Sequence, residues 1–409
     1  MAQKARRPVD KVAGLALSPV ADAVAAGGAD VWRVHYSALA LKDAGHDPIV
    51  LTVGDPDFDT PCAVIEAGVA AMRGGQTHYT ISGGDPPLLA AIAHLEQKRL
   101  GRPVEPAHIA CAGGAQNVLY SVFRCLLAEG DEAILLSPPY TMFPGVIASC
   151  GAKVVNVPLD IADGFALDVD AVARAITPDT RAILANFPHN PSGACATRES
   201  MTALVRICED NGVWLISDEA YSDLTYDEPF FSPGMLESDN VIVVRSLSKS
   251  HAMTGWRVGW SVATASLTAV LADFVSHVTY GAPGFIQAGA LAAITQEHSE
   301  VAAMRDAYQE RRDRFLAAID KAPGLSAHKP AAGIFCMVDV RDTGFNGADF
   351  ADQLLEQQMV SVLPGSAFAP ELDGFVRVAL TVPPKQLEEA AQRMGRLVSD
   401  RASLRDAAL

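Results

Sequence analysis

The sequence has no internal repeat, no low-complexity tract and no long uninterrupted hydrophobic run. Its most apolar stretch, residues 261–275, is interrupted by Ser, Thr and Asp273, so we expect a buried helix there and no membrane span. The first residues are basic but lack a continuous apolar core and a cleavage site, so no secretory signal is expected. These absences predict a globular protein that does not associate with a membrane.

Cysteine is sparse and unpaired in its spacing. The chain has 7 cysteines, an odd number, and none of them forms a C-x-x-C pair. This pattern does not suit a disulfide framework, and it points to no metal site. We therefore expect a protein of the reducing cytoplasm with no bound metal.

Basic residues are outnumbered: 32 Lys and Arg face 48 Asp and Glu, a formal net charge of −16. Binding to nucleic acid needs a clustered basic face, so nucleic acid is not an expected partner. With 409 residues the chain is longer than a typical single domain, which predicts two domains or one large layered domain.

Short apolar runs alternate with helical patterns through the middle of the chain. Helices are predicted at 115–128, 168–176 and 198–211, and strands at 133–137, 153–159, 181–187, 213–218 and 241–246. Unbroken apolar runs between helices indicate strands buried on both faces. The pattern predicts an α/β fold whose large domain has a mainly parallel, doubly wound sheet.

The C-terminal part has a different character. Strands are predicted at 333–340, 360–365 and 375–380, and one long helix at about 288–320 connects this part to the rest. We predict a large domain formed by residues 63–320. Residues 1–62 and 321–409 together form a smaller α+β domain.

Polar residues follow three of the predicted strands. Asn190 follows the strand at 181–187, Asp218 and Tyr221 follow the next strand, and Lys249 follows the strand at 241–246. Each residue alone has an ordinary explanation, such as a turn, a helix cap or a surface lysine. Their succession at the carboxyl ends of buried strands, where open parallel sheets bind ligands, indicates a functional site.

These residues carry a resemblance to a known family. VGDPDFDTP at 53–61, PHNPSG, SDEAYSDL, SLSKSHAMTGWRVGW and Arg377 in FVRVAL resemble the class I aminotransferases of the fold-type I pyridoxal-phosphate family. The resemblance extends over nearly the whole chain. It implies the fold-type I architecture, pyridoxal 5′-phosphate as cofactor, and an amino acid and a 2-oxo acid as substrates.

The resemblance also implies roles for single residues. Lys249 matches the lysine that binds the cofactor aldehyde as an imine and moves the Cα proton. Asp218 matches the carboxylate that keeps the pyridine nitrogen protonated. Asn190 and Tyr221 match the two donors to the phenolic oxygen. Tyr140 matches the aromatic ring stacked on the pyridine.

The cofactor phosphate has its own expected ligands. The helix start at 113–115 offers backbone amides to an anion. The residues that the resemblance assigns to the phosphate are Arg257, Ser246, Ser248, Gly113, Gly114 and Ala115. Tyr79 resembles the tyrosine that reaches the phosphate of the neighbouring subunit, which implies a homodimer with shared active sites.

Substrate recognition is expected at Arg377, whose guanidinium suits the α-carboxylate, with Gly54 close to the same group and Asn190 beside it. No Lys or Arg occurs between Arg257 and Arg305, which disfavours specificity for a dicarboxylate, although His277 could compensate. A narrower resemblance, to arginine–pyruvate transaminases, covers residues 30–61, SKSHAMTGWRVGW, YGAPGFIQ and VSVLPGSAFAP.

That resemblance implies arginine or another basic amino acid as donor and pyruvate as acceptor. Trp32 lies at the pocket-lining position, with Asp30 close by, although core packing and solvent exposure explain these two equally well. Three alternatives stay open. The first is an aminotransferase that acts on aspartate, aromatic or other neutral amino acids. The second is a β-C–S lyase of the same cofactor family, and the third is a non-catalytic regulator.

Overall fold

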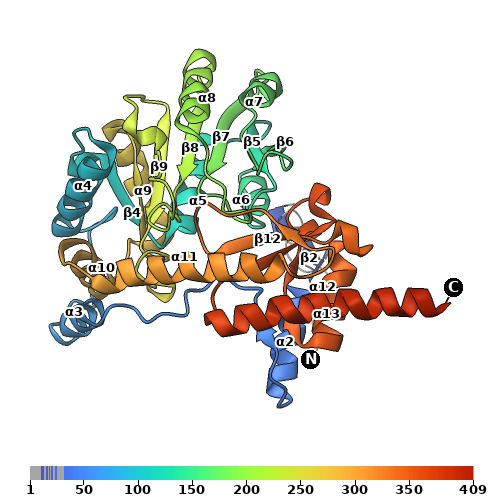
Figure 1. The fold of residues 1–409 in the computed structure, drawn as a ribbon. Helices are drawn as coiled ribbons and strands as arrows, with labels where there is room; N and C mark the ends of the chain where they lie inside the picture. Colours follow the sequence, from blue (N-terminus) through green and yellow to red (C-terminus); the bar gives the residue numbers. More distant parts are fainter. Residues whose placement is uncertain are drawn as a thin grey trace.

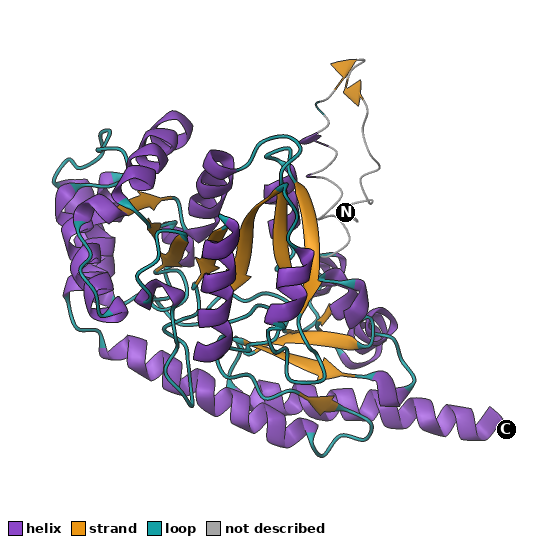
Figure 2. Ribbon diagram, turned by 90° about the horizontal axis from the view of Figure 1, so that it is seen from above, coloured by secondary structure: helices purple, strands orange, loops and turns teal. Residues whose placement is uncertain are grey.

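The structure is a computed structural model that describes residues 32–408 and, before them, residues 11, 12, 15, 16, 18, 20, 21 and 24. A large sheet and a small sheet organise this part of the chain, with helices packed around both (Figures 1 and 2). The predicted α/β class, with a mainly parallel large sheet and a smaller α+β region, is confirmed. None of the described helices has both the length and the apolar character needed to cross a membrane.

In the described part of the chain the large sheet has seven strands in the order β4-β10-β9-β8-β7-β5-β6. Their bounds are β4 Ile109–Ala112, β5 Glu132–Ser137, β6 Lys153–Pro158, β7 Thr180–Asn186, β8 Trp214–Asp218, β9 Val241–Ser246 and β10 Gly259–Val262. From β9 to β6 all neighbouring strands are parallel. The strand β10 is antiparallel to both of its neighbours, so β4 and β9 run in the same direction.

Side chains along the central strands alternate between two apolar clusters, one on each face of the sheet. Ile183 and Val243 belong to one cluster, whereas Leu184 and Val244 belong to the other. Helices cover both faces. The first cluster includes residues of α4 (Pro86–Leu100), α7 (Val169–Ala175) and α8 (Arg198–Asn211), and the second includes residues of α5 (Ala115–Leu126), α6 (Phe143–Ala148) and α9 (Ala265–Thr279). Burial on both faces explains why these strands appear in the sequence as unbroken apolar runs.

The small sheet has the antiparallel order β11-β12-β15-β14. Its strands are β11 Ser326–Ala327, β12 Phe335–Asp339, β14 Leu363–Pro364 and β15 Phe375–Ala379. Separate pairs are formed by β3 (Ile49–Val50) with β13 (Val360–Ser361), in parallel, and by β1 (Lys11–Val12) with β2 (Leu15–Ala16). The segment before residue 62 therefore pairs with the C-terminal part of the chain. The domain boundaries at 62/63 and 320/321 stay a prediction.

A third apolar cluster packs under the small sheet and includes residues of four helices. They are α2 (Arg33–Asp43), α11 (Ser299–Ile319), α12 (Gly347–Gln358) and α13 (Pro384–Ala408). Figure 1 shows α11 extending from beside α10 (Gly284–Thr295) to the small sheet, where it lies alongside α13. The remaining elements are α3 (Cys62–Arg73) and the short 3₁₀ helices Pro106–His108, Pro233–Met235, Thr254–Trp256, Arg341–Thr343, Gly365–Ala367 and Pro370–Leu372.

The single helix predicted at 288–320 is wrong, because the chain forms α10 and α11 with a break between them. Gln296 has an extended ψ of 153°, and the His298 Nε2 atom lies 3.1 Å from the carbonyl oxygen of Ala292. The same Ala292 oxygen accepts the backbone N–H of Gln296 at 3.1 Å, so the His298 side chain is a second contact at the end of α10, and α11 begins at Ser299.

One strand prediction and one helix prediction also need correction. The strand expected at 360–365 is divided, because Val360–Ser361 pairs with β3 whereas Leu363–Pro364 pairs with β15. Pro364 suits the edge strand β14, since it has no N–H to donate. Residues 261 and 262, assigned to a buried helix, end the strand β10, and α9 starts only at Ala265.

Candidate active site

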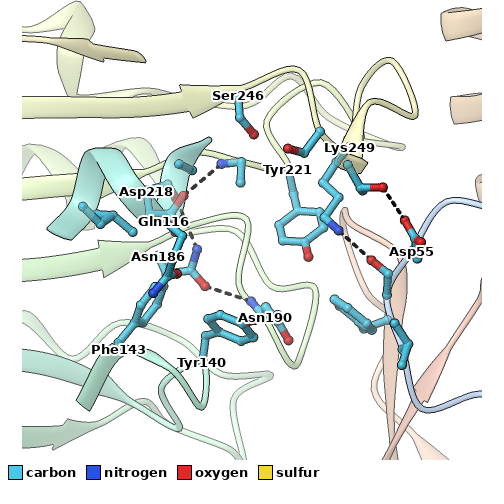
Figure 3. Close-up of a pocket in the computed structure, with 18 of the residues that line it drawn as sticks. Asp55, Gln116, Tyr140, Phe143, Asn186, Asn190, Asp218, Tyr221, Ser246 and Lys249 are labelled. Carbon is cyan, nitrogen blue, oxygen red and sulfur yellow. Dashed lines mark hydrogen bonds between the residues drawn. The ribbon is translucent and has the colours of Figure 1, made fainter. Parts of the chain in front are cut away.

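A cavity of about 470 Å³ opens at the carboxyl ends of the parallel strands (Figure 3). The segments that follow β4, β5, β7, β8 and β9 all contribute side chains to it, because these strands run in the same direction. The small sheet adds residues of β12 and β15, and the segment after β3 closes another side. The cavity therefore occupies the place where open α/β sheets bind their ligands.

Most residues singled out in the sequence meet in this cavity. The lining includes Trp32, Gly54, Ala115, Tyr140, Asn190, Asp218, Tyr221, Ser246, Ser248, Lys249, Arg257 and Arg377. Gly113 and Gly114 contact Arg257 from behind the lining. Tyr79 lies elsewhere, on the surface, with 85% of it exposed. Asp30 lies outside the described residues.

The Lys249 amino group lies at the centre of the cavity. Its Nζ donates a hydrogen bond of 2.6 Å to the backbone oxygen of Gly54, as Figure 3 shows. Burial lowers the pKa of Lys249 to about 8, although the carboxylate of Asp55 acts in the opposite direction. A substantial fraction of the amine is therefore neutral near neutral pH, as a nucleophile or a proton acceptor requires.

Asp218 ends β8 and is 5% exposed. Burial raises the pKa of its carboxyl to about 7, and the neighbouring Glu219 adds to this rise. Its side chain accepts a hydrogen bond of 3.2 Å from the backbone N–H of Ala220, and no Lys, Arg or His in the described part of the chain forms an ion pair with it. The surroundings of Asp218 thus suit a cationic ligand group within hydrogen-bonding reach.

Arg377 on β15 is a buried cation, only 2% exposed. Its guanidinium lies between the rings of Phe335 and Phe368, 4.1 and 4.9 Å from their centroids. It donates to Oδ1 of Asn190 at 3.0 Å and to the backbone oxygen of Thr52 at 2.6 Å, whereas its Nε has no hydrogen-bond partner. Burial lowers the pKa of Arg377 to about 10. An unneutralised guanidinium of this kind suits a carboxylate ligand.

The opposite end of the cavity is built around the start of α5. Gly114 precedes the helix with a φ of +83°, and no side chain caps it, so the first amides are available to an anion. Arg257, itself in the left-handed region with a φ of +56°, donates to the backbone oxygens of Thr254 and Gly113 at 2.8 and 3.3 Å. Ser246 and Ser248 line the same region. Helix amides, hydroxyls and a guanidinium at one end of the cavity suit a phosphate group.

Sequence reasoning missed several residues of the lining. Asn186 ends β7, donates to the backbone oxygen of Asp218 at 3.3 Å and accepts the N–H of Asn190 at 3.2 Å. Asp55 accepts a hydrogen bond of 2.7 Å from the hydroxyl of Thr254. The signal for Asn186 was available, since it is a polar residue at the end of an otherwise apolar run. Other lining residues that were not predicted are Val53, Gln116, Leu119, Phe143, Ala220, Thr254, Gly255 and Phe335.

Close packing against Phe335 explains why position 54 is a glycine. A Cβ at this position would lie 2.1 Å from the Phe335 ring, so a larger residue would displace either the ring or the Gly54 carbonyl that accepts from Lys249. The small residue inferred at this position is therefore a steric requirement of the folded chain.

The family model of the class I and II aminotransferases matches residues 46–394. The chain belongs to the class I and II aminotransferase family. It is 43% identical over 373 residues to the arginine–pyruvate transaminase AruH of Pseudomonas aeruginosa, a match that covers 91% of this chain and 95% of that protein. It is 34% identical over 368 residues to the aspartate/prephenate aminotransferase of Thermus thermophilus, covering 89% and 94%.

Solved structures agree with these relatives. A double mutant of the Thermus thermophilus aspartate aminotransferase superposes with a TM-score of 0.89 at 34% identity, covering 93% of this chain and 99% of that one. The aspartate aminotransferase of Thermotoga maritima gives a TM-score of 0.87 at 29% identity, covering 94% and 100%. The transaminase function inferred from the motifs is therefore confirmed at the level of the family.

Enzymes of this family depend on pyridoxal phosphate, and the cavity fits that molecule on three counts. The buried carboxylate of Asp218 has no cationic partner in the described part of the chain, which suits a protonated pyridine nitrogen. The uncapped start of α5 with Arg257 suits the phosphate. Lys249 supplies the amine for the aldehyde.

Proposed function

We propose that the protein holds pyridoxal 5′-phosphate in this cavity and transfers the amino group of arginine, or of another basic L-amino acid, to pyruvate. The supporting observation is the distribution of charge around the cavity. Its Lys and Arg residues are Lys249, Arg257 and Arg377, and each has a task in handling the cofactor or the α-carboxylate. The carboxylate of Asp55 accepts a hydrogen bond from Thr254 and forms no ion pair in the described part of the chain, which favours a cationic side chain on the substrate.

The cofactor phosphate would be held by Arg257, by the hydroxyls of Ser246 and Ser248, and by the amides that follow Gly113 and Gly114, beginning with Ala115. Tyr140 would cover one face of the ring. Bound pyridoxal phosphate supplies an aldehyde that captures the amine and a ring that accepts the electron pair released at Cα. The Asp218 carboxylate would keep the proton on the ring nitrogen, since an adjacent anion favours the cationic form.

Lys249 is the residue that moves the proton. Its Nζ would take the proton from the substrate Cα and return one during the second half of the transfer. Tyr221 and Asn190 would donate hydrogen bonds to the phenolic oxygen of the ring. Burial raises the pKa of Tyr221 well above its usual range, so its hydroxyl stays protonated and remains a donor.

Arg377 would orient the substrate. Its guanidinium would receive the α-carboxylate, and its bond to Oδ1 of Asn190 turns the amide nitrogen of that residue away from the guanidinium. Gly54 and Trp32 both line the cavity, and the Gly54 backbone would lie beside the carboxylate. The amino-acid side chain would therefore extend past Trp32 and Asp55.

We further propose a homodimer with shared active sites. Tyr79 is 85% exposed, and its ring lies 5.0 Å from that of Tyr280, which is 62% exposed. Ile81, Val278 and Val270 are also exposed, at 59%, 44% and 53%, in the same stretches of chain. Exposed apolar and aromatic side chains in such number favour a surface that packs against a second copy.

A panel of amino donors tests the function. Arginine, lysine, aspartate, phenylalanine, alanine and cysteine would each be supplied with pyruvate or 2-oxoglutarate, and products identified by mass spectrometry. We expect arginine with pyruvate to give alanine and the 2-oxo acid of arginine with the highest kcat/KM. Preference for aspartate would overturn the donor assignment. Pyruvate and ammonia formed from cysteine without an added oxo acid would identify a lyase.

The control is Lys249→Ala, which should show no turnover with any donor. Borohydride treatment should fix the cofactor covalently to the wild-type protein and not to this variant. Covalent fixation in the variant would contradict the assignment of Lys249.

A further inference from the structure

His189 joins the two segments that carry Tyr140 and Asn190. His189 lies three residues beyond the end of β7, whereas Pro138 directly follows the neighbouring strand β5. The His189 Nε2 atom lies 3.0 Å from the backbone oxygen of Pro138, and its Nδ1 atom lies 2.7 Å from the hydroxyl of Ser192. One imidazole ring thus connects the ends of two adjacent strands on the floor of the cavity.

These contacts define the protonation of the ring. A carbonyl oxygen only accepts, so Nε2 must carry a proton and donate it to Pro138. Ser192 already accepts the N–H of Ala194 at 3.2 Å, which leaves its hydroxyl proton for Nδ1 of a neutral ring. Burial lowers the pKa of His189 to about 4, in keeping with this neutral form.

The surroundings leave the ring little freedom. His189 is 3% exposed and packs near Phe165 and Phe187, with ring centroids 6.2 and 5.9 Å away. Water has little access to this buried ring. Removing the His189 donor therefore leaves the buried carbonyl oxygen of Pro138 without a hydrogen bond. Asn190, the next residue, lines the cavity and accepts from Arg377 at 3.0 Å.

We propose that His189 is a positioning residue that fixes Asn190 and Tyr140 relative to one another across the two strand ends. The proposal rests on the proposed function, because it assigns Asn190 to the phenolic oxygen of the cofactor and Tyr140 to its ring face. When the link to Pro138 is lost, the Asn190 donor shifts relative to that oxygen. The anionic form of the bound cofactor then loses stabilisation.

The matched variants are His189→Gln and His189→Asn. A glutamine amide nitrogen reaches about as far as Nε2 and can still donate to Pro138, whereas an asparagine retains only the shorter contact to Ser192. His328→Gln serves as a control, since His328 packs on the same Phe165 ring but does not line the cavity. The readouts are the pH midpoint of the visible absorbance of the bound cofactor, kcat, KM and the melting temperature.

We expect His189→Asn to raise the absorbance midpoint by about one pH unit, because a lost hydrogen bond to a charged group corresponds to roughly that change in pKa. Its kcat should fall roughly ten- to a hundredfold, since small displacements in an active site have effects of that size. His189→Gln should have an absorbance midpoint and a kcat close to those of the wild type, and His328→Gln should change neither quantity.

Wild-type midpoint and kcat in His189→Asn would overturn the proposal, whatever the melting temperature. Equal defects in the Gln and Asn variants would also overturn it, because the Pro138 link would then not be the cause. Absence of any visible absorbance in the wild-type protein after cofactor addition would instead count against the proposed function.

Discussion

Asp218 lies in surroundings that oppose its charge, because it is 5% exposed and lacks an ion-pair partner in the described part of the chain. Its pKa of about 7 in the folded chain exceeds the ordinary value of 3.8 that applies to the unfolded chain. Between these two values the folded chain binds a proton that the unfolded chain has released. The stabilisation from this group is therefore complete below about pH 4 and is lost as the pH rises through about 7.

The first prediction concerns this pH dependence in the cofactor-free protein. The free energy of unfolding of the wild type should fall relative to that of Asp218→Asn between pH 4.5 and 7.5, by on the order of 1.4 kcal/mol for each pH unit. Urea unfolding of both proteins across this range measures the difference. Saturating cofactor should reduce the pH dependence, since a protonated ring nitrogen would pair with the carboxylate. A difference that does not vary with pH would contradict a raised pKa.

Other residues of the site could be identified because their chemistry is distinctive. Asp218 ends an apolar strand, Lys249 follows one and Arg377 lies within one, and the structure brings all three into one cavity. Asn186 and Asp55 were missed for opposite reasons. Asn186 was counted as part of a strand, and Asp55 reaches the cavity only through the folding of the segment after β3.

At the scale of single elements, the start of α5 depends on a glycine. Gly114 has a φ of +83°, and a Cβ there would lie 2.4 Å from Nη2 of Arg257. The residue therefore meets two requirements, a left-handed backbone and a close approach of the guanidinium. Helix amides and guanidinium are thereby held around the same small volume.

The second prediction follows from this packing. Gly114→Ala should displace Arg257 and weaken cofactor binding about tenfold or more, as a strain of about 1–3 kcal/mol implies. Gly130→Ala is the matched control, because Gly130 also has a positive φ, of +95°, but no atom within 4 Å of a Cβ. Absorbance titration with pyridoxal phosphate gives the Kd of each variant. Equal Kd values for the two variants would show that the contact with Arg257 is unimportant.

Helices and strands were predictable wherever the apolar pattern of the sequence matches the burial of the side chains in the fold. The strands from β5 to β9 have apolar side chains toward both faces, so the sequence showed them clearly. The helix predicted at 288–320 failed because the backbone becomes extended at Gln296, which ends α10, and apolar spacing carries no information on that break. The strand predicted at 360–365 failed because the chain changes partner between β13 and β14.

At the scale of the whole molecule, the position of Tyr79 bears on whether two subunits share their active sites. It is outside the cavity that contains Lys249 and is 85% exposed, so it could act in a site only by reaching a neighbouring subunit. Symmetric dimers place such a residue of each copy at the site of the other.

Subunit complementation tests this arrangement. Each of the variants Tyr79→Ala and Lys249→Ala should be inactive or impaired alone. When the two are unfolded together, refolded and assayed at limiting cofactor, the mixture should recover roughly a quarter of wild-type activity. The reason is that half of the dimers then contain one native site. Lys249→Ala mixed with Asp218→Ala is the control, since both residues line the same cavity and no native site can form. No recovery in the first mixture would place Tyr79 outside the partner's site.

The sequence by itself determined the α/β class, the parallel strands and the residues that carry the chemistry, because strand burial and functional side chains leave direct traces in residue type and order. Tertiary structure alone decided which of those side chains meet. It joined β3 to β13, closed the cavity with Gly54 against Phe335, placed Arg377 between two rings, and connected the Pro138 and Asn190 segments through His189. Those contacts depend on chain segments far apart in sequence, and local patterns contain no information about such distances. Lys249 marked the site in the sequence, but only the folded chain shows the groups that surround it.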